Sequence, residues 1–427
     1  MNKMCFFCFK RSVQHGRCTS CGRIASASSG RGANDALLPG TQLDHGSIIV
    51  GEVLGHGGFG ITYVAQDSTY GVIALKEFFP RSIAKREGTC VTATGEDDAS
   101  YERYMADFKR EVKHLLNLQA HPNIIKVLFD ISENNTFYYG MELLQGESLR
   151  ALLNRKGRMD PGKAFQLLEP ILDALIFAHN KKTLHRDIAP DNIFLRNNPR
   201  DPENPSPCLI DFGAAFTDKN GFTFVAPAVA KRGFSPPDQG LPYDQQGPFI
   251  DVYAITATYY NMVTGHVPPP AVERQNKGII SASALNPAVS AQLEQVISKG
   301  MELNHEKRYQ TVTELKAALH AALEPKRIQI ALLICDKGPM KGTKFTLNKA
   351  SLTIGREADL RISDMDRLAS RKHCKVIFAG GCWYIEDLKS HNGTSLNHQK
   401  IPAGQRVKLA PNVLIGIGQE EFLFNIK

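Results

Sequence analysis

The chain has 427 residues, of which 42% are hydrophobic, and a formal net charge of +8. This length predicts about three domains, and the hydrophobic content supports packed cores over disorder. No apolar run approaches the roughly 20 residues of a membrane helix, and the short apolar run at the N-terminus does not fit a signal peptide. We therefore expect no membrane partner and a cytoplasmic location.

The positive charge is concentrated at one end of the chain. Residues 1–40 hold six of the 51 basic residues and one of the 43 acidic residues, which leaves 45 basic and 42 acidic residues in 41–427. This balance gives no support to a nucleic-acid partner. Four of the nine cysteines lie within the first 21 residues, and the scattered remainder indicates reduced thiols of a cytosolic protein.

The N-terminal segment contains two C-x-x-C pairs nine residues apart, namely Cys5 with Cys8 and Cys18 with Cys21. Each pair can hold one edge of a tetrahedral Zn²⁺ through thiolates, and so short a segment needs a metal because it cannot bury a core. Residues 1–23 resemble small zinc ribbons, which implies a bound Zn²⁺ in a docking or structural role. A redox-active dithiol pair is the alternative. Residues 24–44, rich in Ser, Gly and Ala, are predicted to be a flexible linker.

A glycine-rich stretch follows between two predicted strands, at residues 48–54 and 62–65. A glycine loop between strands differs from the dinucleotide-binding fold, where the loop opens a helix. Its glycines let backbone N–H groups approach phosphate oxygens, and they are Gly55, Gly57, Gly58 and Gly60. Phe59 at the tip is placed to shield those phosphates from water.

The next strand ends in Lys76, and a helix is predicted over residues 101–118 from apolar residues at helical spacing. Glu111 lies beside the apolar face of that helix, from where its carboxylate can pair with Lys76. Glu96 and Glu102 are the alternative partners.

Two short segments further along carry the groups that phosphoryl transfer needs. The stretch His185-Arg186-Asp187-Ile188-Ala189-Pro190-Asp191-Asn192 precedes a short strand, and Cys208-Leu209-Ile210-Asp211-Phe212-Gly213 is a second strand ending in an acid and a glycine. Asp187 can accept a hydroxyl proton. Asn192 and Asp211 can bind a hard cation.

H-R-D-x-x-x-x-N followed by D-F-G resembles the catalytic and metal loops of the bacterial eukaryotic-like Ser/Thr protein kinases. The resemblance covers residues 45–323 and implies an α+β fold with an N-lobe at 45–140 and a C-lobe at 145–323. It implies that Asp187 orients the acceptor hydroxyl and takes its proton. It further implies that Asn192 and Asp211 hold Mg²⁺ or Mn²⁺ against ATP, and that Lys76, oriented by Glu111, holds the α- and β-phosphates.

The same resemblance implies an adenine site at the hinge between the lobes. Met141 is the gatekeeper, Glu142 and Leu144 offer backbone groups to adenine, and Glu147 or Ser148 meets the ribose. The nucleotide-binding set that the resemblance implies also includes Ala74, Phe194, Lys76 and the glycine loop.

Two departures from the family pattern affect the active site. Ala189 stands where most Ser/Thr kinases have a lysine that steadies the γ-phosphate, so positive charge is missing there. Lys231 stands where such kinases usually have a threonine that helps to define the acceptor. The choice between Ser/Thr and dual specificity therefore stays open.

Other positions follow the family with smaller changes. Asp238 replaces the glutamate of the A-P-E motif and is expected to pair with Arg308. Asp251, at the start of an apolar helix, is expected to brace the backbone of the catalytic loop. Thr217 and Thr223 are candidate autophosphorylation sites.

The composition changes after Pro325, where short strand-like runs alternate with turns, as in an all-β sandwich. The loops carry Gly355-Arg356, Ser370-Arg371-Lys372-His373 and Asn392-Gly393-Thr394. In this order the motifs resemble the forkhead-associated (FHA) domain, here over residues 327–427. The resemblance implies that phosphothreonine is bound by Arg356, Ser370, Arg371 and Asn392, while Gly355 and His373 stabilise the loops. A sandwich that no longer binds phosphopeptides is the alternative.

Together these features predict a multidomain chain with a small zinc ribbon, a two-lobed kinase and an all-β FHA sandwich. We interpret it as a Ser/Thr protein kinase that uses ATP, a divalent cation and Zn²⁺, acts on protein substrates including itself, and binds phosphothreonine proteins. The alternative is a catalytically silent scaffold that only binds ATP or phosphopeptides. The complete set of Lys76, Glu111, Asp187, Asn192 and Asp211 favours the enzyme.

Overall fold

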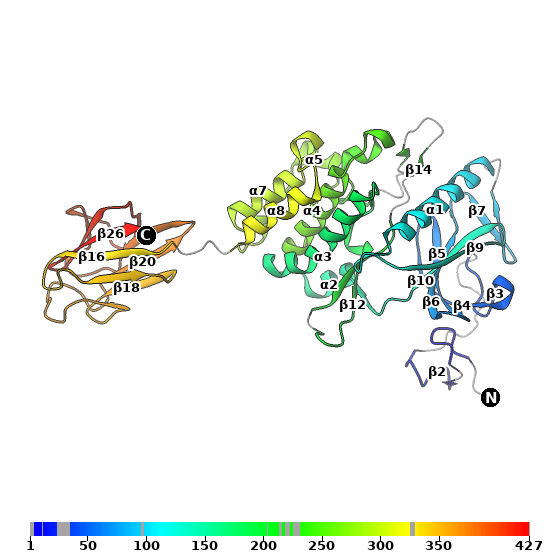
Figure 1. The fold of residues 1–427 in the computed structure, drawn as a ribbon, viewed down its shortest axis with the longest axis horizontal. Coiled ribbons are helices and arrows are strands. Elements are labelled where there is room, and N and C mark those ends of the chain that lie inside the picture. The colour runs from blue at the N-terminus through cyan, green and yellow to red at the C-terminus, as the bar shows by residue number, and fades with distance from the viewer. Residues whose placement is uncertain are drawn as a thin grey trace. The chain divides into compact units, whose positions relative to one another are not determined.

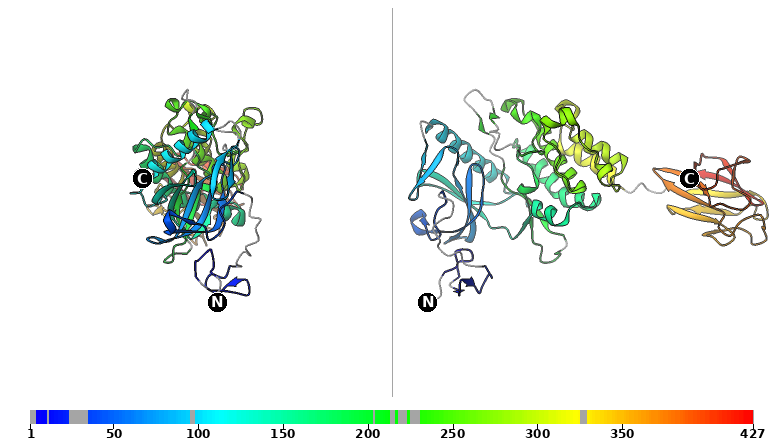
Figure 2. Two further views of the ribbon diagram at one scale, coloured as in Figure 1. Left: turned by 90° about the vertical axis from the view of Figure 1, so that its right-hand side faces the viewer. Right: turned by 180° about the vertical axis from the view of Figure 1, so that it is seen from behind.

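The structure, a computed structural model, describes residues 4–10, 12–23, 35–94, 98–202, 204–212, 216–217, 223–224, 231–324 and 329–426. The chain divides into two compact units, Met1–Leu323 and Glu324–Lys427. The first unit holds the cysteine-rich segment, a strand-rich N-lobe and a helical C-lobe (Figures 1 and 2). The second unit is all β.

The cysteine-rich segment is a short hairpin of β1 (Val13–Gln14) and β2 (Arg17–Cys18). It contacts the N-lobe at one strand. The amide of Glu52 donates to the carbonyl of Phe6 over 3.0 Å, and the Arg23 guanidinium lies 3.8 Å from the Glu52 carboxylate. The guanidinium of Arg23 also stacks on the ring of Phe7, 3.4 Å from its centroid.

The N-lobe is built on a six-stranded antiparallel sheet in the order β3-β4-β5-β6-β10-β9. Its strands are β3 (Gln42–Leu43), β4 (Ile48–His56), β5 (Gly60–Asp67), β6 (Gly71–Phe78), β9 (Val127–Glu133) and β10 (Thr136–Glu142). Their alternating apolar residues form one buried face. Helix α1 (Asp98–Leu118) packs against this face through Phe108, whose ring lies 5.4 Å from that of Phe78 and 5.6 Å from that of Tyr139.

A hairpin of β7 (Ala84–Glu87) and β8 (Cys90–Ala93) separates β6 from α1. It is fixed by a buried ion pair, because Arg86 donates to the carboxylate of Glu77 over 2.6 Å and the two side chains are 4% and 0% exposed. The hydroxyl of Tyr63 donates to the same carboxylate. A buried charge is tolerated only with such partners, so this network ties the hairpin to the sheet.

Residues 35–44 depart from the prediction of a flexible linker. Leu37 is buried, and its amide donates to the hydroxyl of Tyr63 over 3.0 Å. Gln42 and Leu43 form β3, which pairs with the start of β4. The apolar side chains of Leu37 and Leu43 explain the difference, since both join the N-lobe core. Residues 24–34 of the predicted linker lie outside the described residues.

The C-lobe is mainly helical. Its elements are β11 (Gly146–Ser148), α2 (Leu149–Lys156), α3 (Pro161–Asn180), η2 (Pro190–Asn192), β12 (Ile193–Arg196), β13 (Ser206–Leu209), β14 (Phe216–Thr217), β15 (Thr223–Phe224), η3 (Pro237–Gly240), η4 (Tyr243–Gln245), α4 (Phe249–Thr264), α5 (Ala271–Lys277), α6 (Ala282–Leu285), α7 (Ala291–Gly300), η5 (His305–Lys307) and α8 (Val312–Leu323). Every residue of α4 from Ile250 to Thr264 is buried, as expected of a helix that is largely apolar all round. Helix α4 is therefore the central support of the lobe.

Asp238 and Arg308 form the predicted ion pair. The guanidinium of Arg308 lies 2.5 Å from the Asp238 carboxylate and is fully buried. It also donates to the carbonyls of Glu302 and Phe249 over 2.8 and 2.9 Å. One side chain therefore joins η3, the start of α4 and the segment before α8.

The second unit is a sandwich of two sheets, with strand orders β17-β16-β26-β25-β22-β23 and β19-β18-β20-β21-β24. Its strands are β16 (Ala331–Lys337), β17 (Lys344–Leu347), β18 (Ser351–Gly355), β19 (Leu360–Arg361), β20 (Cys374–Ala379), β21 (Cys382–Asp387), β22 (Ser395–Leu396), β23 (Gln399–Lys400), β24 (Arg406–Lys408), β25 (Val413–Ile417) and β26 (Glu420–Ile426). The core between the sheets includes Trp383, Phe422 and Phe424. The all-β prediction is confirmed.

Within the described ranges, no helix combines the length and the apolar character that a bilayer crossing requires.

Replacing Arg308 by methionine should destabilise the first unit by about 3 kcal/mol or more, because the change leaves a carboxylate and three carbonyls without their buried donor. The midpoint of urea unfolding followed by circular dichroism at 222 nm should fall. The only tryptophan, Trp383, lies in the second unit, so its fluorescence midpoint should stay unchanged. Arg232→Met, at a side chain that is 82% exposed, is the control. Equal midpoints for the two variants would contradict the role of Arg308.

Candidate active site

The backbone of the catalytic-loop segment is held in place by one buried carboxylate. Asp251, at the start of α4, accepts hydrogen bonds from the amides of His185 and Arg186, both over 2.8 Å, and from the ring of His179 over 2.8 Å. Arg186 has a φ of 64°, a conformation that costs energy in a non-glycine residue and persists only when the surroundings hold it. The predicted bracing by Asp251 is therefore present.

Asp187 and Asn192 are brought together. The side-chain amide of Asn192 donates to both the backbone carbonyl and the carboxylate of Asp187, each over 2.7 Å. The carbonyl of Asn192 in turn accepts from the amide of Ile210, so β12 and β13 hold Asn192 next to the segment that carries Asp211. A second contact to Asp187 comes from Lys231, whose ammonium lies 3.1 Å from the carboxylate.

Lys76 lies near its predicted partner Glu111 and also contacts Asp211, which the sequence assigned to the cation. Its ammonium bonds to the carboxylate of Asp211 and lies 4.0 Å from that of Glu111. It also lies within 6 Å of two rings, 5.6 Å from the centroid of Phe108 and 5.7 Å from that of Tyr139. The strand β6, the helix α1 and the segment after β13 thus converge on one ammonium. Glu96, one of the two alternative partners predicted for Lys76, lies outside the described residues.

The cleft perturbs its carboxyl groups in different directions. Burial raises the pKa of Glu111 to about 7, although Lys76 lowers it. Burial also raises the pKa of Asp187, while Lys231 and Asn192 act against that rise. For Asp211, burial raises the pKa, but the contact with Lys76 outweighs it and leaves the pKa below its ordinary value. Asp211 is therefore the most readily ionised of the three.

His185 packs rather than reacts. Its ring lies 4.5 Å from that of Phe212, and its Nδ1 accepts from the amide of Asp187. Burial lowers the pKa of His185 to about 4, so the ring is neutral near pH 7. Gly213, the last residue of the D-F-G motif, lies outside the described residues, as do the side chains of Thr217 and Thr223.

The glycine-rich stretch connects β4 to β5, and its tip is closed by a hydrogen bond of 2.8 Å from the amide of Gly57 to the carbonyl of Gly60. Gly55, Gly57 and Gly58 are exposed. A Cβ on Gly60 would lie 2.6 Å from the carbonyl oxygen of Glu77 and 3.7 Å from Cε of Lys76. The end of the loop at Gly60 therefore lies next to the side chain of Lys76. Phe59 lies against α1, with its ring 5.7 Å from that of Tyr104.

Strand pairing places several residues of the predicted adenine site opposite one another. Ala74 of β6 pairs with Met141 of β10, and Phe194 of β12 pairs with Ser148 of β11. Glu142 and Leu144 follow at the end of β10 and are partly buried. The hydroxyl of Ser148 caps α2 by accepting from Ala151, and Glu147 binds Arg155 over 2.5 Å, so both ribose candidates already have protein partners.

The four N-terminal cysteines form one cluster, in which all the sulfur atoms lie within 4.8 Å of one another. The Sγ atoms of Cys5 and Cys21 are 3.8 Å apart, and those of Cys8 and Cys18 are 3.6 Å apart. Tetrahedral Zn²⁺ with bonds of about 2.3 Å places its sulfur ligands about 3.8 Å apart. The donor set and its spacing therefore fit a zinc ion.

Three loops of the sandwich bring its predicted binding residues together. Arg356 donates through Nε to the carbonyl of Ala369 over 2.8 Å, a bond that uses one of the five N–H donors of its guanidinium. The hydroxyl of Ser370 accepts from the amide of His391, and Asn392 donates to the carbonyl of Leu368. Arg371 is exposed.

Gly355 and His373 stabilise these loops, as predicted. A Cβ on Gly355 would lie 2.3 Å from the carbonyl oxygen of Arg371, and the buried ring of His373 accepts from the amide of Ser370. Sequence reasoning missed Asp387, whose buried carboxylate accepts from Ser390 and Thr394 and shapes the loop between β21 and β22. An acid directly before a Ser- and Thr-containing turn is the signal that was available.

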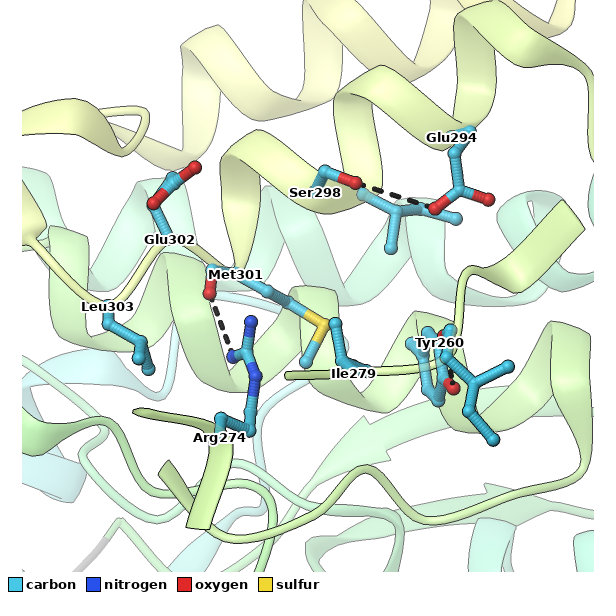
Figure 3. A pocket seen from close by; sticks show the side chains of 10 residues that line it. Tyr260, Arg274, Ile279, Glu294, Ser298, Met301, Glu302 and Leu303 are labelled. Carbon is cyan, nitrogen blue, oxygen red and sulfur yellow. Dashed lines mark hydrogen bonds between the residues drawn. The ribbon is translucent and has the colours of Figure 1, made fainter. Parts of the chain in front are cut away.

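A cavity of about 270 Å³ lies elsewhere in the C-lobe, between α4, the segment after α5, and α7 (Figure 3). None of the predicted site residues lines it. Its polar groups already have partners: Arg274 donates to the carbonyl of Met301 and to the hydroxyl of Tyr253, and the carboxylate of Glu294 accepts from the amide of Ser283 and the hydroxyl of Ser298. It is therefore not the site of the chemistry.

Comparison with protein families places residues 48–321 in the protein kinase domain. The chain belongs to the protein kinase family. Residues 352–418 match the FHA domain, so the kinase is followed by an FHA domain, as the loop motifs predicted. The two-lobed and all-β predictions for these parts are both confirmed.

Named relatives include bacterial Ser/Thr kinases. The chain is 29% identical over 280 residues to serine/threonine-protein kinase D of Synechocystis sp., covering 63% of this chain and 51% of the relative. It is 30% identical over 301 residues to PknD of Mycobacterium tuberculosis, covering 67% and 41%. The chain thus spans about half the length, or less, of these curated relatives.

Solved structures give the same fold. The apo form of PpkA-294 is 30% identical with a TM-score of 0.56 and covers 67% of this chain and 99% of its own. The PknI kinase domain of Mycobacterium tuberculosis is 22% identical with a TM-score of 0.50, and the match covers 67% of this chain and 100% of that one.

Proposed function

We propose that this protein transfers the γ-phosphate of ATP to Ser or Thr hydroxyls of proteins, including itself. The observation that carries the proposal is the convergence of Lys76, Asp187, Asn192 and Asp211 on one cleft. Phosphoryl transfer needs mainly positioning and charge stabilisation, because little covalent chemistry falls to the protein. In the proposal, Asp187 orients the acceptor hydroxyl and takes its proton.

The cation and the nucleotide have matching groups in the cleft. Asn192 and Asp211 would hold Mg²⁺ or Mn²⁺, which would neutralise charge on the phosphates, and the oxygen donors of both suit a hard cation. Lys76 would turn from Asp211 to the α- and β-phosphates while Glu111 orients it. The glycine loop over Lys76 would cover those phosphates, and Ala74, Met141 and Phe194 would enclose the adenine.

A catalytically silent scaffold is the competing function. It would be favoured by the loss of a residue that binds the phosphates or the metal, but the lysine, both metal-binding groups and the base are present. Lys76 also contacts Asp211, 135 residues further along the chain, and Asn192 contacts Asp187, 5 residues before it. This agreement of sequence and geometry favours catalysis.

For the FHA domain we propose phosphothreonine binding by Arg356, Ser370, Arg371 and Asn392. The guanidinium of Arg356 can form charge-assisted bonds to phosphate oxygens, and Ser370 adds a hydroxyl. A phosphothreonine made by the kinase domain, on itself or on a client, would then be retained at a raised effective concentration.

For the cysteine cluster we propose a structural Zn²⁺ held by Cys5, Cys8, Cys18 and Cys21. The spacing of the sulfur atoms supports it.

The remaining five cysteines are free, which supports a cytoplasmic location in which thiols stay reduced.

Incubation of the full chain with labelled ATP and Mg²⁺ should transfer label to the protein itself and to casein. Asp187→Ala should lower the rate by at least about 100-fold, because it removes the group that takes the proton. Asp201→Ala, at a carboxylate in the β12–β13 loop, should leave the rate close to that of the parent. Nucleotide binding without any transfer by the parent would instead support the scaffold.

Arg356→Ala should weaken binding of a fluorescent phosphothreonine peptide library by about 100-fold, since a charge-assisted contact to the phosphate is lost. Fluorescence anisotropy measures the affinity, with the unphosphorylated library as the reference ligand. Arg406→Ala, at a residue of β24 whose guanidinium lies 3.4 Å from the carboxylate of Glu386 on β21, should bind like the parent. Equal affinity of the parent for both libraries would refute phosphothreonine recognition.

The purified chain should contain about one zinc ion, by elemental mass spectrometry. Cys5→Ser should lose most of it, whereas Cys90→Ser, at an exposed thiol outside the cluster, should keep it. A metal-free parent with disulfides among the four cysteines would establish the dithiol alternative.

A further inference from the structure

The catalytic loop has no cationic side chain between Asp187 and Asn192. Between Asp187 and Asn192 the sequence reads Ile-Ala-Pro-Asp, and Ala189 is fully buried. The ammonium group that touches Asp187 comes instead from Lys231, 44 residues further along the chain, with Nζ 3.1 Å from the carboxylate. Lys231 therefore supplies a positive charge beside Asp187 that the residues between Asp187 and Asn192 do not supply.

The turn that carries Lys231 is held in place by several contacts. The carbonyl of Lys231 accepts from the amides of Phe234 and Ser235, which closes the turn. Gly233 has a φ of 88°, and a Cβ there would lie 2.3 Å from the carbonyl oxygen of Pro268. The turn is thus pressed against the segment after α4.

Two further contacts tie this turn to the catalytic loop itself. The side-chain amide of Gln239 donates to the carbonyl of Arg186 over 2.6 Å. The guanidinium of Arg150 lies 5.4 Å from the ring of Phe234 and pairs with Asp191 over 3.2 Å. These contacts hold the segment that carries Lys231 against the catalytic loop.

The chemistry of the contact suits phosphoryl transfer. An ammonium has three donors, and the contact with Asp187 occupies one direction of it. The side chain of Lys231 is 28% exposed, so it is partly desolvated yet open on one side. Charge builds up on the phosphoryl oxygens in the transition state, where a fixed cation stabilises it strongly.

We propose that Lys231 replaces the lysine missing at Ala189: it holds the carboxylate of Asp187 in place and contacts the γ-phosphate during transfer. This inference rests on the proposed kinase activity and deepens it. It assigns to the segment before the S-P-P-D motif a role in the reaction in addition to any role in acceptor binding.

The test compares variants of the full chain in steady-state transfer of label from ATP to casein. Lys231→Met, which keeps most of the apolar part of the side chain but removes its charge, should lower kcat by about 100-fold and change the KM for ATP much less. Lys231→Arg should retain most of the parent's rate. Ala189→Lys combined with Lys231→Met should recover at least about tenfold over Lys231→Met alone. Arg232→Met, on the same turn but 82% exposed and paired with Glu273, should behave like the parent.

Three results would overturn the inference. Lys231→Met as active as the parent would show that the ammonium is dispensable, and a more active variant would show that the contact inhibits Asp187. Lys231→Arg as impaired as Lys231→Met would show that charge is not the property that matters. An inactive parent would refute the kinase activity itself, which separates that failure from a failure of the Lys231 role.

Discussion

The active site depends on the buried carboxylate of Asp251. It lies at the start of α4, the helix that is buried on all sides, and it accepts the amides of His185 and Arg186. A carboxylate placed without water must satisfy its lone pairs inside the protein, so the helix and the loop are fixed to each other. The left-handed backbone of Arg186 and the position of Asp187 follow from this contact. The core of the C-lobe thus determines where Asp187, the proposed proton acceptor, lies.

The cleft above that loop is organised by alternating charge. Lys76 lies between Glu111 and Asp211, and Lys231 lies beside Asp187. Each carboxylate has a cation or an amide as its partner, which limits the cost of bringing three acids into one partly enclosed space. When nucleotide and metal bind, the cationic groups would contact phosphates instead of carboxylates, and the metal-binding carboxylate would contact a divalent cation instead of an ammonium. The contacts within the cleft are therefore the contacts that ligands would replace.

Polar and metal-binding groups also organise the two smaller parts. In the cysteine-rich segment four sulfur atoms take the place of an apolar core, since so few residues bury little surface. In the FHA domain the exposed loops are shaped from behind by buried polar groups, namely His373 and Asp387. Both arrangements hold surface residues rigidly and leave their outer atoms available to a partner.

The sequence by itself determined the domain types, and it also supplied the residues that we propose for the active site. Short motifs such as H-R-D-x-x-x-x-N, D-F-G and the paired C-x-x-C are local, and their function requires fixed spacing along the chain. The pairs Asp238–Arg308 and Lys76–Glu111 were also accessible, because family position identifies both partners. Only the tertiary structure decided contacts between positions with no shared motif. The ammonium of Lys231 on Asp187, the Glu77–Arg86 pair under the β7–β8 hairpin and the packing of Leu37 and Leu43 on the N-lobe are of this kind. A lysine or a leucine in a polar stretch looks solvated in sequence, and its partner is fixed only when distant segments fold against each other.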